Sequence, residues 1–158
     1  MPLPTSGPIT AAMINTELGR AANTPISLND PAVRQLAGKP SGTISMRDFH
    51  GKSYGGLLVA GSGGLGYKGF EDSQHYRYGS LDHLPGAPAK PIAFIDVFYG
   101  GRIAFAGDQV AFLTGKRLFI DGVEKSMKPP AIYEGRTNWD GAGKFGFVDG
   151  QSYRVRIV

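Results

Sequence analysis

The 158-residue chain contains no cysteine, a single tryptophan and no long hydrophobic run. Without cysteine, neither a disulfide framework nor a thiolate metal site can form. No stretch approaches the ~18 consecutive apolar residues of a transmembrane helix, so we expect no membrane insertion. The opening residues, MPLPTSGPIT, lack the basic start and apolar centre of a signal peptide. The hydrophobic content of 41% is nevertheless enough for a packed core.

A concentrated positive charge is also missing, although the net charge is +4. Residues 1–54 carry 5 basic and 3 acidic side chains, and residues 55–158 carry 12 and 10, so each part has an excess of two. The longest basic run is Lys116-Arg117. Nucleic-acid-binding domains cluster their charge on one stripe or helix. We therefore expect no nucleic acid partner.

Glycine and proline are abundant, with 24 and 11 residues, which favours turns and short strands over long helices. The hydrophobic period changes near Tyr54, from a helical spacing to an alternation of two. We predict an α+β fold with segregated parts: a module of short helices at residues 1–53, and an all-β sandwich or small barrel at residues 54–158.

The first part contains a repeated pattern of an apolar residue followed by a hydroxyl residue: Pro8-Ile9-Thr10, Pro25-Ile26-Ser27 and Thr43-Ile44-Ser45. Serine and threonine are good N-caps because their side-chain oxygen accepts an unpaired backbone N–H. Each pattern therefore predicts the start of a helix of about two turns. The expected C-terminal stops are Gly19, Gly38 and Gly51.

The individual caps can also be predicted. Asn29 or Asp30 replaces Ser27 as the cap of the second helix, because Pro31 suits the first helical turn. Ser45 and Asp48 resemble a capping box at the start of the third helix. Within this helix, Met46 and Phe49 are expected to face inward.

Helices this short do not persist alone, so their apolar residues must pack on one another or on a partner. One interpretation is a small helical domain without a site, and the other is a docking module. For docking we predict a set of apolar residues spread over the three helical segments: Ile9, Ile26, Leu28, Ile44, Met46 and Phe49.

Beyond Tyr54 the sequence predicts short strands separated by turns. Tyr153, Val155 and Ile157 alternate with polar or outward residues, which indicates a strand with one buried face. The apolar run at residues 92–99 is broken only by an aspartate and suits a central strand. Residues 118–120 followed by Asp121-Gly122 predict a strand entering a tight turn.

The stretch HGKSYGGLLVAGSGGLG, residues 50–66, resembles two nucleotide-binding motifs. The phosphate-binding loop fails because its first glycine would fall at position 46, which is Met46. The glycines 61, 63 and 66 have dinucleotide-fingerprint spacing, but no helix of useful length follows them. We predict that residues 57–60 form the first strand, that Gly61–Gly66 is its flexible exit, and that no cofactor binds.

The sequence offers no evident catalytic or metal site. It has no Gly-x-Ser-x-Gly elbow and no paired-carboxylate motif, so we expect no enzymatic activity. His75 and His83, with two neighbouring aspartates, match no metal-ligand spacing. Trp139, near a predicted turn, is assigned either to the core or, with Tyr67 and Tyr78, to a glycan-binding platform.

Two sets of motifs resemble known proteins. The first third contains, in order, Pro4-x-Ser6-Gly7-Pro8-Ile9, Glu17-Leu18-Gly19, Ile26-Ser27-Leu28-Asn29-Asp30, Val33-Arg34-x-Leu36-Ala37-Gly38 and Ile44-Ser45-Met46-x-Asp48-Phe49-x-Gly51-Lys52-Ser53. The remainder contains Gly66-Tyr67, Tyr78-Gly79-Ser80-Leu81, Phe119-Ile120-Asp121-Gly122, Trp139 and Gly150-Gln151-Ser152-Tyr153-x-Val155. The first set closely resembles an N-terminal segment of structural proteins of tailed-bacteriophage virions. The second resembles a phage tail β domain more loosely, and the proline-rich residues 85–91 depart from it.

This resemblance implies a non-enzymatic structural component of the tail, tail tip, baseplate or neck, made in the host cytoplasm and incorporated into the virion. Its expected partners are other virion proteins and further copies of itself. The alternatives are a module that binds a host-surface glycan or receptor, and a capsid decoration protein.

Overall fold

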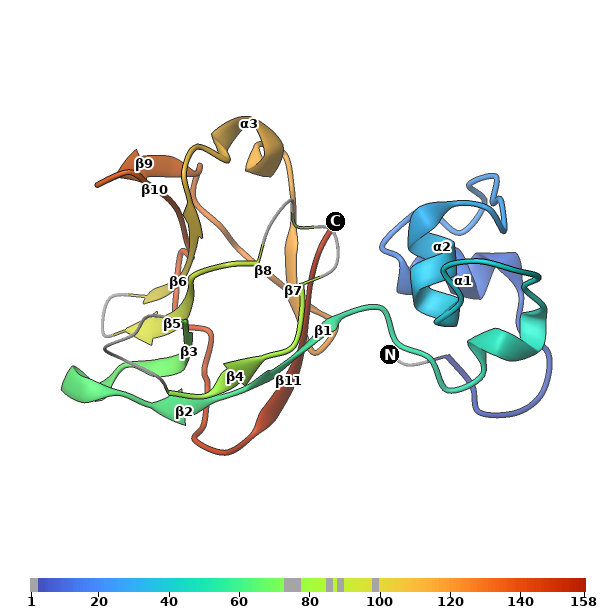
Figure 1. Cartoon of the computed structure of the whole chain (residues 1–158), viewed down its shortest axis with the longest axis horizontal. Helices are drawn as coiled ribbons and strands as arrows, with labels where there is room; N and C mark the ends of the chain where they lie inside the picture. Colours follow the sequence, from blue (N-terminus) through green and yellow to red (C-terminus); the bar gives the residue numbers. More distant parts are fainter. Residues whose placement is uncertain (1–2, 73–77, 85–86, 88–89, 98–99) are drawn as a thin grey trace. The chain divides into compact units, whose positions relative to one another are not determined.

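The computed structural model describes residues 3–72, 78–84, 87, 90–97 and 100–158. The chain divides into two compact units (Figure 1). The N-terminal unit comprises Met1–Tyr54 together with Val158, and the β unit comprises Gly55–Ile157. The division falls one residue beyond the boundary expected from the sequence.

Two α-helices in the N-terminal unit begin at the expected caps. Helix α1 spans Ala11–Glu17, and the Thr10 hydroxyl accepts the N–H of Met13 at 3.2 Å. Helix α2 spans Pro31–Ala37, and the Asp30 carboxylate accepts two backbone N–H groups of its first turn, at 2.8 and 3.3 Å. Gly38 ends α2 with φ 71°, as the left-handed C-terminal position requires. These cap predictions are confirmed.

The third helical segment is a single 3₁₀ turn, η1, at Met46–Phe49. Asp48 Oδ2 accepts the Ser45 N–H at 2.7 Å and the Ser45 hydroxyl at 3.1 Å, so Ser45 and Asp48 are linked as predicted. Gly51, two residues after the end of η1, has φ 68°, which leaves no room for the two turns that the sequence suggested.

The N-terminal unit has its own hydrophobic core. Leu3 is part of this core, because it is buried and its N–H bonds to the carbonyl of Lys52 at 2.8 Å. The Gly51 N–H bonds to the carbonyl of Pro4 at 2.9 Å, so the start and the exit of the unit lie side by side. The core residues come from the N-terminal segment, both helices, η1 and the exit: Leu3, Ile9, Ile14, Leu18, Val33, Leu36, Ala37, Ile44, Phe49 and Tyr54.

The described part of the β unit contains eleven short strands in two antiparallel sheets. The first sheet has the order β4-β1-β11-β7-β8, and the second has the order β2-β3-β5-β6-β10-β9. Each sheet ends in two separate edge strands, so the unit is not a closed barrel, and that alternative is wrong. The strands are β1 Gly56–Val59, β2 Gly61–Ser62, β3 Lys68–Glu71, β4 Ser80–Leu81, β5 Ala93–Val97, β6 Gly100–Ala106, β7 Leu118–Ile120, β8 Val123–Lys125, β9 Ala131–Tyr133, β10 Arg136–Asp140 and β11 Ser152–Ile157.

Two hairpins close through pairs of residues with positive φ. Asp121 and Gly122, at 50° and 78°, join β7 to β8, which confirms the predicted turn. Glu134 and Gly135, at 50° and 72°, join β9 to β10. Two successive positive φ values match the right-handed twist of the flanking strands.

Side chains from both sheets meet in one hydrophobic core cluster. Val155 and Ile157 of β11 are buried in it, which confirms the predicted apolar face of this strand. Strand β5 lies inside the second sheet, and its Asp96 is buried. The Asp96 carboxylate accepts the N–H groups of residues 145, 146 and 147 at 2.9–3.0 Å, which satisfies the buried charge. Two short helices, η2 at Gly64–Gly66 and α3 at Val110–Leu113, complete the unit.

Candidate functional site

The glycine-rich stretch at residues 50–66 is a packing feature of the fold. A side chain at Gly56 would collide with the carbonyl of His83, and one at Gly61 would collide with the backbone of Gly79. Gly63 lies against the ring of Tyr78. These glycines are therefore needed where chain segments approach closely, and not for contact with a phosphate.

The expected flexible exit is ordered into secondary structure. Gly61–Ser62 is strand β2, paired with β3, and the Ser62 hydroxyl donates to the carboxylate of Asp149. The following helix η2 has only three residues and is interrupted by Leu65 at φ 62°. A dinucleotide fingerprint opens a full helix onto the pyrophosphate, and this geometry is not present at residues 61–66.

The six residues predicted for docking divide into buried and exposed groups. Ile9, Ile44 and Phe49 are 8%, 8% and 0% exposed and lie in the core of the N-terminal unit. They fill that core because helices of one or two turns are stable only when packed on one another. Ile26 is partly buried against the same core, so these four side chains do not form a docking surface.

Leu28 and Met46 remain at the surface, at 37% and 40% exposure. The expectation that Met46 faces inward is therefore wrong. Met46 is the first residue of η1, and a side chain at that position leans back beyond the start of the helix. Ile44, in the extended segment before the helix, contributes to the core instead. The exposed pair is the candidate docking site.

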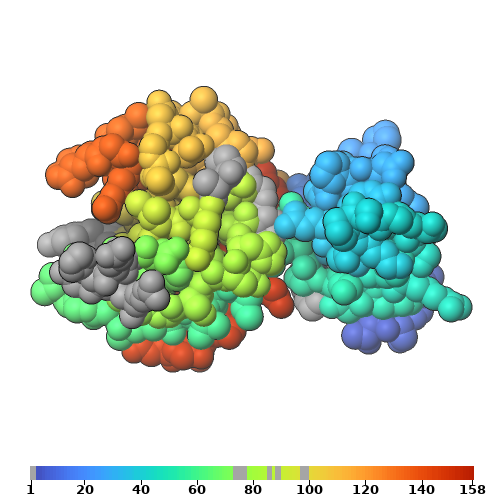
Figure 2. Space-filling view, in the orientation of Figure 1, coloured from blue at the N-terminus to red at the C-terminus, as the bar shows by residue number. Residues whose placement is uncertain are grey.

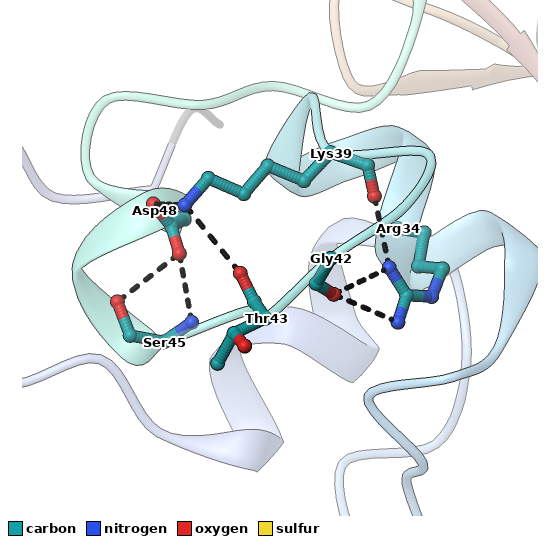
Figure 3. A network of polar contacts seen from close by, with 6 residues as sticks. All are labelled: Arg34, Lys39, Gly42, Thr43, Ser45 and Asp48. Atoms are coloured by element: carbon teal, nitrogen blue, oxygen red, sulfur yellow. Dashed lines mark hydrogen bonds and ion pairs between the residues drawn. The ribbon is translucent and has the colours of Figure 1, made fainter.

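The Arg34 guanidinium fixes the loop that carries Leu28 through Asn29, and Figure 3 shows its bonds to the carbonyls of Lys39 and Gly42. Its Nη2 donates to Asn29 Oδ1 at 2.9 Å, and both terminal nitrogens donate to the carbonyl of Gly42 at 3.1 Å. Nη1 also donates to the carbonyl of Lys39 at 3.2 Å. The guanidinium therefore holds the segment before α2 against the loop that leads to η1.

Lys39 and Asp48 fix η1, which carries Met46 (Figure 3). The Lys39 Nζ lies 2.9 Å from Asp48 Oδ1 and 3.5 Å from the carbonyl of Thr43. The Ser45 N–H, and next the Lys39 ammonium, lower the pKa of Asp48 to about 2. The carboxylate is thus charged at neutral pH and keeps both partners in place.

The cap of α2 is also a charged group. Burial raises the pKa of Asp30, but the N–H groups of Val33 and Ala32 and the Arg20 side chain together outweigh burial and lower it. Arg20 Nη2 lies 2.9 Å from Asp30 Oδ2. Leu28 therefore lies just before α2, and Met46 begins η1, and the starts of both helices are stabilised by ionised aspartates.

The residues predicted for a glycan platform are mostly buried. Trp139 is 2% exposed, and it lies within β10 in the core of the β unit instead of near a turn. Tyr78 is buried and donates its hydroxyl to Glu71 Oε2 at 2.8 Å, while Tyr67 is half-buried. Trp139 and Tyr78 are therefore not available for stacking on a sugar. Core filling accounts for Trp139.

The acidic and histidine residues form isolated pairs. Asp72 pairs with Lys90 at 3.2 Å, and Asp82 Oδ1 lies 3.0 Å from His83 Nδ1, whereas His75 lies outside the described residues. Within residues 3–72, 78–84, 87, 90–97 and 100–158, no group of three or more potential ligands is placed to hold a metal ion. No helix in this described part has the length and apolar character to span a bilayer.

Sequence reasoning missed the polar face of β10. Arg136, Asn138 and Asp140 alternate with the buried Thr137 and Trp139, so they point away from the core. The alternation of polar and apolar residues is visible at residues 136–140 of the sequence, but the sequence-based prediction placed Trp139 near a turn and not within a strand. The register with the neighbouring strands shows which residues share that face.

Comparisons of the chain with protein-family models, curated proteins and solved structures found no match.

Proposed function

We propose that this chain is a non-enzymatic structural component of a tailed-phage virion, in the tail, tail tip or neck. Its N-terminal unit docks onto the assembly, and its β unit is carried beside or outward from the docking site. The ordered motifs of the first third support this proposal by their resemblance to virion proteins. The observation that carries it is the division at Tyr54–Gly55, which separates a small unit with a core of its own from the β unit.

The β unit is proposed to be a β-sandwich. Leu58, Leu118 and Val155 of the first sheet share one core cluster with residues of the second. The second sheet contributes Phe94, Ile103, Phe105 and Trp139. Two antiparallel sheets that bury their inner faces together form a rigid domain suited to a particle surface.

Docking is proposed to use Leu28 and Met46. Both are exposed apolar side chains, on the loop before α2 and on η1, and Arg34, Lys39 and Asp48 fix these segments, so little backbone entropy is lost on docking. The partner is a virion protein that offers an apolar surface. Several copies are expected in each particle, because such assemblies are symmetric.

Deletion of residues 1–53 tests the role of the N-terminal unit. The shortened protein should keep the circular dichroism spectrum of a β fold and should no longer be incorporated into particles, as measured by immunoblotting of purified virions. If the shortened protein is incorporated at the normal level, docking through this unit is wrong.

A double variant of the full chain, Leu28→Ser with Met46→Ser, tests the surface itself. It should fold normally and show reduced incorporation, because the apolar contacts are lost while the core is unchanged. Leu65→Ser is the matched control, since Leu65 is 81% exposed on the β unit. Equal incorporation of the double variant and the control would contradict docking through Leu28 and Met46.

The first alternative is a host-surface glycan or receptor-binding module, and the exposed polar face of β10 favours it. A capsid decoration protein differs from the proposed tail component only in location. A low-resolution map of the particle with this chain located in it distinguishes the two locations.

A further inference from the structure

One face of the second sheet carries side chains that point away from the core. On β10 these are Arg136, Asn138 and Asp140, because Thr137 and Trp139 are buried on the opposite side. The register pairs them with residues of β6 and β9 on the same face. We name this surface the β10 outer face, and its residues are Arg102, Ala104, Ala106, Ala131, Tyr133, Arg136, Asn138 and Asp140.

The centre of the β10 outer face is lined by small side chains. Ala104 and Ala131 pair with Asn138 from its two sides, and Ala93 pairs with Ala104 in turn. Ala93 and Ala104 are each 4% exposed, yet neither belongs to the core cluster. Both are therefore covered and add no exposed surface to the face. The exposed Ala106 and Ala131, which pair with Arg136 and Asn138, form the alanine floor of the β10 outer face.

An aromatic ring stands at the margin of this floor. Tyr133 is 64% exposed and lies opposite Arg136 in the β9–β10 hairpin. In Figure 2 the orange segment that contains this hairpin stands at an edge of the β unit. An exposed ring beside polar groups suits stacking on the apolar face of a pyranose.

Two polar side chains of the face have no hydrogen-bonding partner among the described residues. They are the Asn138 amide, which is half-buried, and the exposed Arg136 guanidinium. Arg102 differs, because its Nε donates to Asp140 Oδ1 at 2.7 Å. An amide and a guanidinium offer planar, directional donors that match hydroxyl and carboxylate or phosphate oxygens.

The face offers one arginine for an anionic group, and its strand is anchored. Arg102 pairs with Asp140, whereas Arg136 has no ion-pair partner among the described residues, and Glu134 lies in the turn just before it. Strand β10 is anchored from below by Thr137, which donates to the carbonyl of Gly107 at 2.6 Å and accepts the N–H of Gln109 at 2.8 Å. A preformed site loses little entropy on binding.

We propose that the β10 outer face binds a saccharide that carries carboxylate or phosphate groups. Tyr133 stacks on a sugar ring, Asn138 bonds to its hydroxyl groups, and Arg136 pairs with the anionic group. The alanine floor admits the ring without a clash. This inference goes beyond the proposed structural role and does not depend on where in a virion the chain is located.

The test uses the purified full chain on an array of immobilised bacterial polysaccharides, with acidic members and their neutral counterparts. The chain should bind at least one acidic polysaccharide and bind the neutral counterpart more weakly. Tyr133→Ala and Arg136→Gln should each weaken that binding about tenfold, which corresponds to ~1.4 kcal/mol. Asn138→Ala should weaken it less, and Tyr133→Phe, which keeps the ring, should retain it.

Two controls separate this site from general surface charge and from misfolding. Ile132→Ala changes the same strand on its other face, and Arg47→Gln removes an exposed arginine from the N-terminal unit. Both should bind like the unaltered chain. Thermal melts of every variant check that it is folded. If Tyr133→Ala unfolds, the binding of the two single variants Asn138→Ala and Arg136→Gln decides the outcome.

Four results would overturn the proposal. They are the absence of binding to every acidic polysaccharide, equal binding to neutral counterparts, equal losses in Arg47→Gln and Arg136→Gln, and a Tyr133→Ala variant that binds like Ile132→Ala.

Discussion

The two units of the molecule are stabilised in different ways. Among the described residues, the core of the N-terminal unit has 10 buried members, and its short helices depend on side-chain caps and on a polar network around Arg34 and Lys39. The core of the β unit has 16 buried members in the part that the structure describes, and both sheets contribute to it. The first unit therefore combines a small core with side-chain caps and polar contacts, whereas the second depends mainly on a larger core between paired strands. Substitutions of the two kinds should have effects of different size.

The largest effect is expected from the β-unit core. Trp139→Ala removes the only tryptophan, which is 2% exposed, and should lower the free energy of unfolding by about 3–5 kcal/mol. The loss combines lost burial with a cavity that neighbouring side chains do not refill. Urea denaturation monitored by circular dichroism measures it. A variant of unchanged stability would show that Trp139 is not a core residue.

The next effect comes from the glycine-rich stretch. Gly61→Ala should destabilise the β unit by about 1–3 kcal/mol, because the added methyl group meets the backbone of Gly79. Gly64→Ala is the matched control, since nothing lies within 4 Å of its added methyl group, and it should change stability by less than about 0.5 kcal/mol. Similar midpoints of thermal unfolding for the two variants would contradict the packing role of Gly61.

A smaller effect is expected from the N-terminal unit. Asp30→Ala removes the two hydrogen bonds that cap α2 and the ion pair with Arg20, and it should cost about 1 kcal/mol. Asp30→Asn keeps a capping oxygen and should restore most of the loss. Hydrogen exchange of the α2 amides measures both variants. Equal exchange in the two variants would show that the cap contributes nothing beyond the charge.

The smallest effect is a pH dependence of the N-terminal unit. The pKa of Asp48 is lowered from 3.8 to about 2, so ionised Asp48 stabilises the folded state at pH values above its ordinary pKa. This stabilisation should be lost as the pH falls from about 4 to about 2. In Asp48→Asn the dependence should be weaker, with the remainder due to Asp30, whose pKa is also lowered. If the stability of Asp48→Asn and of the unaltered chain depended on pH in the same way, the proposed contribution of ionised Asp48 would be wrong.

Local chemistry made much of the fold predictable. Thr10 and Asp30 cap their helices, Gly38 ends α2, and Asp121-Gly122 forms a hairpin turn, because each depends on residues within a few positions in the chain. The apolar face of β11 was predictable for the same reason, since its alternation is visible within six residues.

The candidate sites were less predictable, because apolar composition does not say which apolar residues are buried. Phe49 and Met46 are three residues apart in one helical turn, yet one fills the core and the other is exposed. Burial at this scale depends on which neighbouring segments already occupy the core. The sequence likewise did not distinguish between a core role and a surface role for Trp139. In the folded chain its neighbours bury it in the core of the β unit.

By itself, the sequence determined the caps, the turns, the alternation of the strands and the absence of a thiolate site, since these follow from residue types and short spacings. Only the tertiary structure decided that the glycines at residues 56–63 are positions of close packing, and that Tyr133, Arg136 and Asn138 share one face. Both depend on strand register and on contacts between distant segments, which no local pattern specifies.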